Sequence, residues 1–115
     1  NAIIEPMLKE HVLPELESSE PFLRSRANWL YGEFSTFEYS DTRHVQDAMD
    51  GIYKSLFVEE LPTKLAAAIS LAQMLTNTTA RTLIKPALGT ILQVYLKLIS
   101  EIDSEKLVSS LETIM

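Results

Sequence analysis

A pattern of helix-forming residues recurs along this 115-residue chain at an offset of about forty positions. Residues 21–27 (PFLRSRA) align with residues 61–67 (LPTKLAA), which places Arg24 opposite Lys64. A second step of the same size reaches Ser104, where another helical pattern starts. A unit of this length cannot bury its apolar face alone, so such units stack on their neighbours along the chain.

Apolar residues recur at helical spacing in six segments, each bounded by capping residues or proline. Leu, Ala, Ile and Glu are abundant, while glycine occurs three times and proline five, so helices are expected and strands are not. Pro14 should bend or end the first helix, Ser40 or Asp41 should cap the third, and Asp103 the last. The segments are residues 2–16, 21–37, 42–56, 62–77, 79–102 (divided into 79–84 and 86–102) and 103–115.

The third and fourth segments each carry one apolar stripe, as amphipathic helices do. The alanines at 66–68 would let a neighbouring helix approach closely. Residues 86–102 are apolar on most of their circumference, so we expect this helix to be covered on several sides. The stripes are Val45, Met49, Ile52 and Leu56 in the third segment, and Leu65, Ala68, Ala72 and Leu75 in the fourth.

Five aromatic residues fall within residues 24–39. A helical wheel places Phe22 and Trp29 on one shoulder of this helix and Tyr31 on the other, where neighbouring repeats would bury them. Tyr39 lies beyond the helix and is expected to be exposed. The residues expected in the core are Leu23, Ala27, Leu30, Phe34 and Phe37.

A period near forty with two helices per unit is typical of HEAT-type repeats. We predict an all-α, HEAT-like (armadillo-type) α-solenoid fragment of about six antiparallel helices. Because the chain starts without methionine and ends inside a helical pattern, we expect it to be part of a longer protein. Residues 1–115 then form one segment, with a lone second-type helix at 1–17, repeats at 20–57 and 61–102, and the start of another at 103–115.

Charge and composition argue against several classes of function. The net charge is −6, and the ten basic residues are scattered among sixteen acids, so no nucleic-acid surface is expected and basic partners fit better. No run of eighteen apolar residues occurs, and the first residues lack a basic region followed by an apolar one, so neither a membrane span nor a signal peptide is expected. The chain has no cysteine, which excludes disulfides and thiolate metal sites.

Side chains that could perform catalysis do not form a recognisable site. His44, Asp47 and Asp50 recur every three residues, but helical rotation spreads them over about 120°, so we expect a solvated face. His11 stands alone and is expected at the surface. Glycine-rich phosphate loops, nucleophile elbows and zinc-protease patterns do not occur. We therefore expect no enzyme activity, no catalytic residue, no cofactor and no metal.

Polar rows mark the two helices that would be second within their repeats. In a HEAT superhelix the second helices line the concave side, which is offered to partners. The alternative, that these residues only solvate their helices, stays open. The candidate protein-contact residues are Arg43, Asp47, Asp50 and Lys54, spaced as i,i+4 pairs, together with Gln93 and Lys97.

Four stretches resemble the middle of importin-β superfamily transport receptors, most of all the branch that contains importins seven and eight. They are FLRSRANWL (22–30), ELPTKLAAAI (60–69), IKPALGTIL (84–92) and LISE (98–101). The resemblance implies an all-α superhelix that binds protein cargo and carries it through the nuclear pore under Ran GTPase control, shuttling between cytoplasm and nucleus. It implies Ran and nucleoporins as partners of the full-length receptor, and it places no Ran-contacting residue in this segment.

Two other functions stay open. A HEAT-repeat scaffold subunit of a protein complex would show the same periodicity without a transport role. A self-contained helical homodimer would use the apolar ends of the chain as its interface.

Overall fold

The computed structural model describes residues 4–35, 39, 41–58, 60–75, 77–102 and 105–114. Helices occupy most of these residues, and none of them lies in a strand. The elements are α1 (Ile4–Met7), the π-helix η1 (Leu8–Val12), the 3₁₀-helix η2 (Leu13–Glu17), α2 (Pro21–Glu33), α3 (Thr42–Ser55), α4 (Leu61–Met74), α5 (Thr78–Ile84), the 3₁₀-helix η3 (Lys85–Ala87), α6 (Leu88–Glu101) and α7 (Glu105–Ile114).

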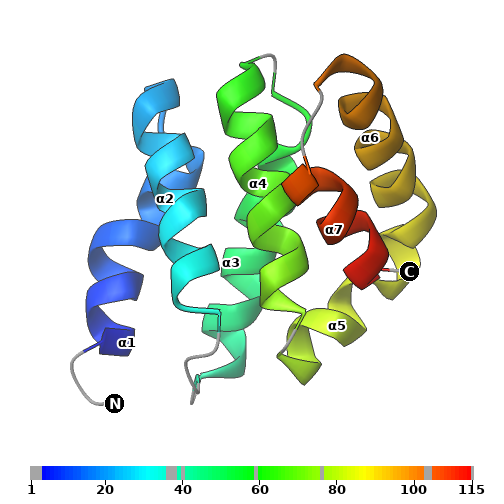
Figure 1. Ribbon diagram of the computed structural model, residues 1–115. Coiled ribbons are helices and arrows are strands. Elements are labelled where there is room, and N and C mark those ends of the chain that lie inside the picture. The colour runs from blue at the N-terminus through cyan, green and yellow to red at the C-terminus, as the bar shows by residue number, and fades with distance from the viewer. Residues whose placement is uncertain are drawn as a thin grey trace.

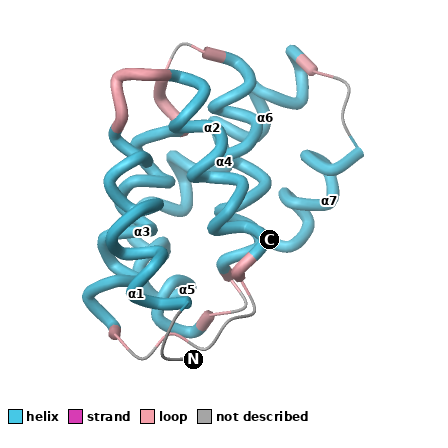
Figure 2. Tube along the Cα trace, turned by 90° about the vertical axis from the view of Figure 1, so that its left-hand side faces the viewer, coloured by secondary structure: helices cyan, strands magenta, loops and turns pink. Residues whose placement is uncertain are grey.

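The helices form two layers. In one layer α2, α4 and α7 follow one another, with α2 packed along α4 and α4 against α7 (Figure 1). The other layer holds the N-terminal helical segment, α3 and the α5–α6 segment, and α3 contacts both η2 and α5 (Figure 2). The predicted all-α, HEAT-like fold is confirmed.

The N-terminal segment is helical but irregular. Pro14 lies in η2, where the α-helix has already given way to π and 3₁₀ turns, as expected of a residue without an N–H donor. Leu8, Val12 and Leu16 nevertheless point into the core. Gly51 on α3 allows this approach, because a Cβ there would lie 2.8 Å from Leu16 Cδ1.

Helices α2 and α4 meet along a seam of small and polar residues. The Ser25 and Thr63 hydroxyls lie 2.9 Å apart, and the Ser70 hydroxyl donates to the Asn28 carbonyl. Gly32 faces the Ser70 and Gln73 side chains so closely that a Cβ would overlap them. The bonded residues are 38 and 42 positions apart, so the two helices aligned by the forty-residue repeat lie side by side.

The apolar stripes predicted for α3 and α4 form the core between the layers. All four residues of the first stripe are buried, including Leu56 just after α3, and within the second stripe only Leu65 stays partly exposed. The Tyr95 hydroxyl of α6 donates to the Ala68 carbonyl, which confirms a close approach at the alanine run. Asn77 caps α5 by accepting the Ala80 N–H at 3.1 Å.

Several predicted burials are wrong. Phe22 is 73% exposed and Trp29 56%, because α4 flanks α2 on one side and no described residue covers this shoulder. Tyr31 and Ala27 are buried as expected.

Tyr39, expected to be exposed, is half-buried, and its hydroxyl donates to the Phe34 carbonyl at 3.0 Å. Leu23, Leu30 and Phe34 are partly buried, whereas the expectations for Phe37, Ser40 and Asp103 fall outside the described residues.

Helix α6 is covered less than its composition predicts. Ile91, Tyr95 and Leu98 are buried, but Leu96 is 58% exposed among the described contacts. The continuous helical segment Thr78–Glu101 contains an 18-residue stretch with a mean hydropathy of 1.2, and it is long and apolar enough to cross a membrane. Core helices of soluble proteins can have the same length and composition, and α6 buries Ile91, Tyr95 and Leu98 against the neighbouring helices.

Candidate functional site

The outward side of α3 carries a row of four charged residues. Asp41 is the N-cap residue of α3, and its side chain accepts the Arg43 N–H at 3.0 Å. The apolar stripe of the helix faces the core, so its opposite side faces solvent. Both predicted i,i+4 pairs form. Arg43 Nε lies 3.7 Å from Asp47 Oδ1, and Lys54 Nζ lies 3.1 Å from Asp50 Oδ2.

Lys54 is shared by two carboxylates. Its Nζ lies 3.2 Å from Glu17 Oε1 at the end of η2 as well as close to Asp50. The hydrogen bond to Asp50 and, to a smaller extent, the one to Glu17 raise the pKa of Lys54. The three side chains together carry one net negative charge at neutral pH. Local spacing could not predict the contact with Glu17, which lies 37 positions before Lys54.

Gln93 and Lys97 lie on the exposed side of α6, opposite Ile91 and Leu98. The Lys97 side chain forms no ion pair or hydrogen bond with any described side chain. Asp50 reaches the space between α3 and α6, whereas neither α6 residue lines it. The structure therefore groups the four residues of α3 with Glu17 and does not join the α6 pair to them.

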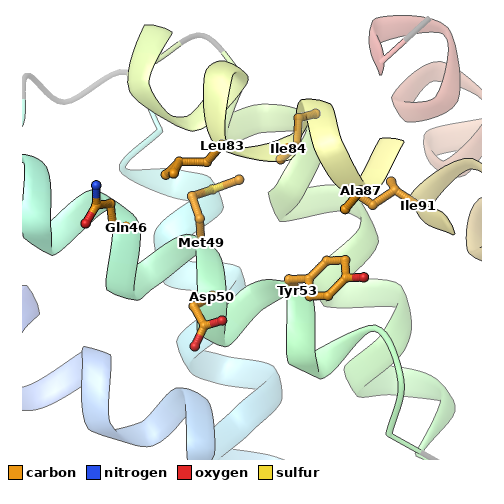
Figure 3. A pocket seen from close by; sticks show the side chains of 8 residues that line it. All are labelled: Gln46, Met49, Asp50, Tyr53, Leu83, Ile84, Ala87 and Ile91. Atoms are coloured by element: carbon orange, nitrogen blue, oxygen red, sulfur yellow. The ribbon is translucent and has the colours of Figure 1, made fainter. Parts of the chain in front are cut away.

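An apolar groove runs between α3 and the α5–α6 segment, with a volume of about 290 Å³ (Figure 3). Met49 points from α3 toward Leu83 and Ile84, while the Asp50 carboxylate turns away from these apolar side chains (Figure 3). Sequence reasoning missed the groove because each helix contributes one wall. The lining residues are Gln46, Met49, Asp50 and Tyr53 on α3, and Leu83, Ile84, Ala87 and Ile91 opposite.

The predicted solvent exposure of His44 is wrong, because its side chain is fully buried. His44 Nδ1 lies 3.3 Å from Glu5 Oε2, and Nε2 lies 2.8 Å from the Tyr31 hydroxyl. Glu5 also accepts the Asp41 N–H at 3.1 Å. Burial raises the pKa of the Tyr31 phenol. These contacts tie α1, α2 and the start of α3 together.

Because His44 points inward, it does not converge with Asp47 and Asp50, which are exposed. No group of three His, Asp or Glu side chains that could hold a metal ion occurs in the part of the chain that the structure describes. His11 is exposed as expected, with Nε2 3.8 Å from Glu10. The polar rows and the groove therefore remain as the candidate protein-binding surface.

Neither a protein-family model nor a solved structure matches this chain. Three curated relatives align with 97% of it. They are the importin beta-like SAD2 homolog of Arabidopsis thaliana (30% identity, 11% of its length), the probable importin-7 homolog of Dictyostelium discoideum (32%, 10%) and importin-8 of Mus musculus (29%, 11%). The chain therefore spans about a tenth of the length of these relatives.

Proposed function

Because this chain is homologous over nearly all of its residues to one segment of importin-7/8-like proteins, we propose that it is part of a nuclear import receptor. The full-length protein would bind protein cargo, carry it through the nuclear pore and respond to Ran GTPase. It would shuttle between cytoplasm and nucleus and meet nucleoporins on the way. The observation that carries the proposal is an alignment that covers 97% of the chain.

The function rests on shape and charge rather than on catalysis. Stacked helix pairs present long rows of side chains, and such rows serve as extended binding surfaces in repeat proteins. Residues 20–57 and 61–102 would be two such repeats, which the side-by-side placement of α2 and α4 supports.

The contact surface for cargo would be the outward face of α3 and α6, with Arg43, Asp47, Asp50 and Lys54 on one helix and Gln93 and Lys97 on the other. All six side chains are exposed, so a partner can reach them without disturbing the core. Exposed charges contribute more to orientation, selectivity and association rate than to raw affinity.

Ran-dependent release tests the proposal. The full-length protein that contains these residues would be immobilised, loaded with cytosolic proteins, and washed with Ran bound to GTP or, as the control, to GDP. We expect a set of bound proteins to be released by Ran-GTP and retained with Ran-GDP. Equal retention under both conditions would refute the transport role and favour a HEAT-repeat scaffold.

A further inference from the structure

The groove between α3 and the α5–α6 segment combines an apolar interior with a polar rim. Its deepest residues, Met49, Ile84 and Ile91, are buried, while Leu83 is 38% exposed at the mouth. Asp50 stands at the rim with its carboxylate turned outward (Figure 3). An apolar surface of this kind is stabilised when a partner's apolar side chain removes it from water.

The size of the groove limits what can enter it. About 290 Å³ is at the lower end of the range for pockets that enclose a small organic ligand. This volume admits one or two side chains of an extended segment. It does not admit a further helix between α3 and α6, since helix axes pack about 8–10 Å apart.

The charges beside the groove favour a cationic neighbour for that side chain. Asp50 and Glu17 share the single ammonium of Lys54, which leaves one negative charge uncompensated at the rim. One turn earlier, Arg43 and Asp47 neutralise each other. The uncompensated charge is therefore localised at the end of the row that lines the groove, and Gln46 adds an exposed amide beside it.

We propose that this groove binds an extended protein segment in which an aliphatic or aromatic side chain enters between Met49 and Ile91, while a neighbouring Lys or Arg pairs with Asp50. The inference rests on the proposed receptor function, because the segment would belong to a cargo protein. The inference specifies what the receptor would recognise, namely one apolar side chain and one adjacent cation. The two helices that would bind them, α3 and α6, belong to successive repeats.

The test uses three fluorescein-labelled nonapeptides with the full-length protein and measures binding by fluorescence anisotropy. The first peptide carries Leu and Lys two positions apart in a Gly/Ser background. The second replaces Leu with Ser at the same charge, and the third replaces Lys with Glu. We expect the first peptide to bind at least about fivefold more tightly than either of the others.

Two pairs of variants localise the binding. Asp50→Arg should weaken the first peptide at least about fivefold, whereas Glu33→Arg, with the same charge change at an exposed position of α2 that does not line the groove, should leave its affinity within about twofold. Leu83→Arg at the mouth should act like Asp50→Arg. Leu96→Arg, which lies on α6 outside the groove, should act like Glu33→Arg. All four positions are exposed, and circular dichroism would verify that each variant folds.

Several outcomes would overturn the inference. Equal losses from Glu33→Arg and Asp50→Arg would indicate general attraction to an acidic protein, and equal binding of the Ser peptide would show that no apolar side chain enters the groove. If light scattering showed a dimer that Leu83→Arg abolishes, a second copy of this chain would be the occupant of the groove. Failure of the first peptide to bind would also refute it. Ran-GTP release, measured in parallel, separates the two proposals. Release by Ran-GTP without groove-dependent peptide binding would support the receptor role and refute the groove. Groove-dependent peptide binding without release by Ran-GTP would support the groove and refute the receptor role.

Discussion

The hydroxyl of Tyr31 is expected to stabilise the fold through the buried contact with His44. Tyr31→Phe keeps the ring and removes only the oxygen that lies 2.8 Å from His44 Nε2. His44 is fully buried, so water cannot replace this partner. Leaving a buried polar group unsatisfied costs about 1–3 kcal/mol. We expect the free energy of unfolding to fall by about 2 kcal/mol and the melting temperature by roughly 6–12 °C in a chain of this size.

The assay is urea unfolding followed by far-UV circular dichroism, with Tyr53→Phe as the matched control. Tyr53 is only half-buried, and its hydroxyl has no hydrogen-bond partner among the described residues. Its loss should change stability by less than about 0.5 kcal/mol. Equal effects of the two substitutions would refute the reasoning, because they would show that the His44 contact contributes nothing beyond the ring.

Three further predictions concern the surface and the buried phenols. Trp29→Ala should lower the free energy of unfolding in urea by less than about 1 kcal/mol, rather than by the roughly 3–5 kcal/mol typical of a buried tryptophan. A larger loss would indicate that the Trp29 side of α2 is covered in the isolated chain. Arg43→Glu combined with Lys97→Glu should lower cargo affinity in a pull-down while helical content stays constant by circular dichroism; melting of the fold would show that these residues are structural. Burial raises the folded-state pKa of Tyr31, Tyr39 and Tyr95 above the ordinary value of 10.0. The free energy of unfolding should therefore be unaffected by these tyrosines below about pH 10 and should fall as the pH rises above it. Urea titrations at alkaline pH that show no such fall would contradict this prediction.

Local periodicity predicted the elements and the inward side of α3 correctly. The stripe through Val45, Met49 and Ile52 depends only on residues three or four apart, and so do the ion pairs of the charged row. The burial of His44 could not be predicted in this way. It depends on Glu5, 39 positions earlier, and on how the N-terminal segment folds back onto α3.

The exposed shoulder of α2 illustrates a second limit. A helical wheel assigns Trp29 to a face, but it cannot say whether another element covers that face. The groove illustrates the same limit in the candidate site. Met49 belongs to the predicted stripe and Leu83 to the lead-in before α6, yet only the packing of α3 against α5 places them across from each other.

The hydrogen-bonded seam between α2 and α4 has a mechanical consequence. Apolar contacts tolerate sliding because they have no preferred direction, whereas hydroxyl–carbonyl bonds fix both distance and angle. The bonds from Thr63 to Pro21 and from Ser70 to Asn28 lie about two helical turns apart. Because they join α4 to α2 at two separate points, they oppose both rotation and translation of α4 along α2. Bending between successive helix pairs must therefore stretch these bonds, which makes this joint stiffer than one held by apolar side chains alone.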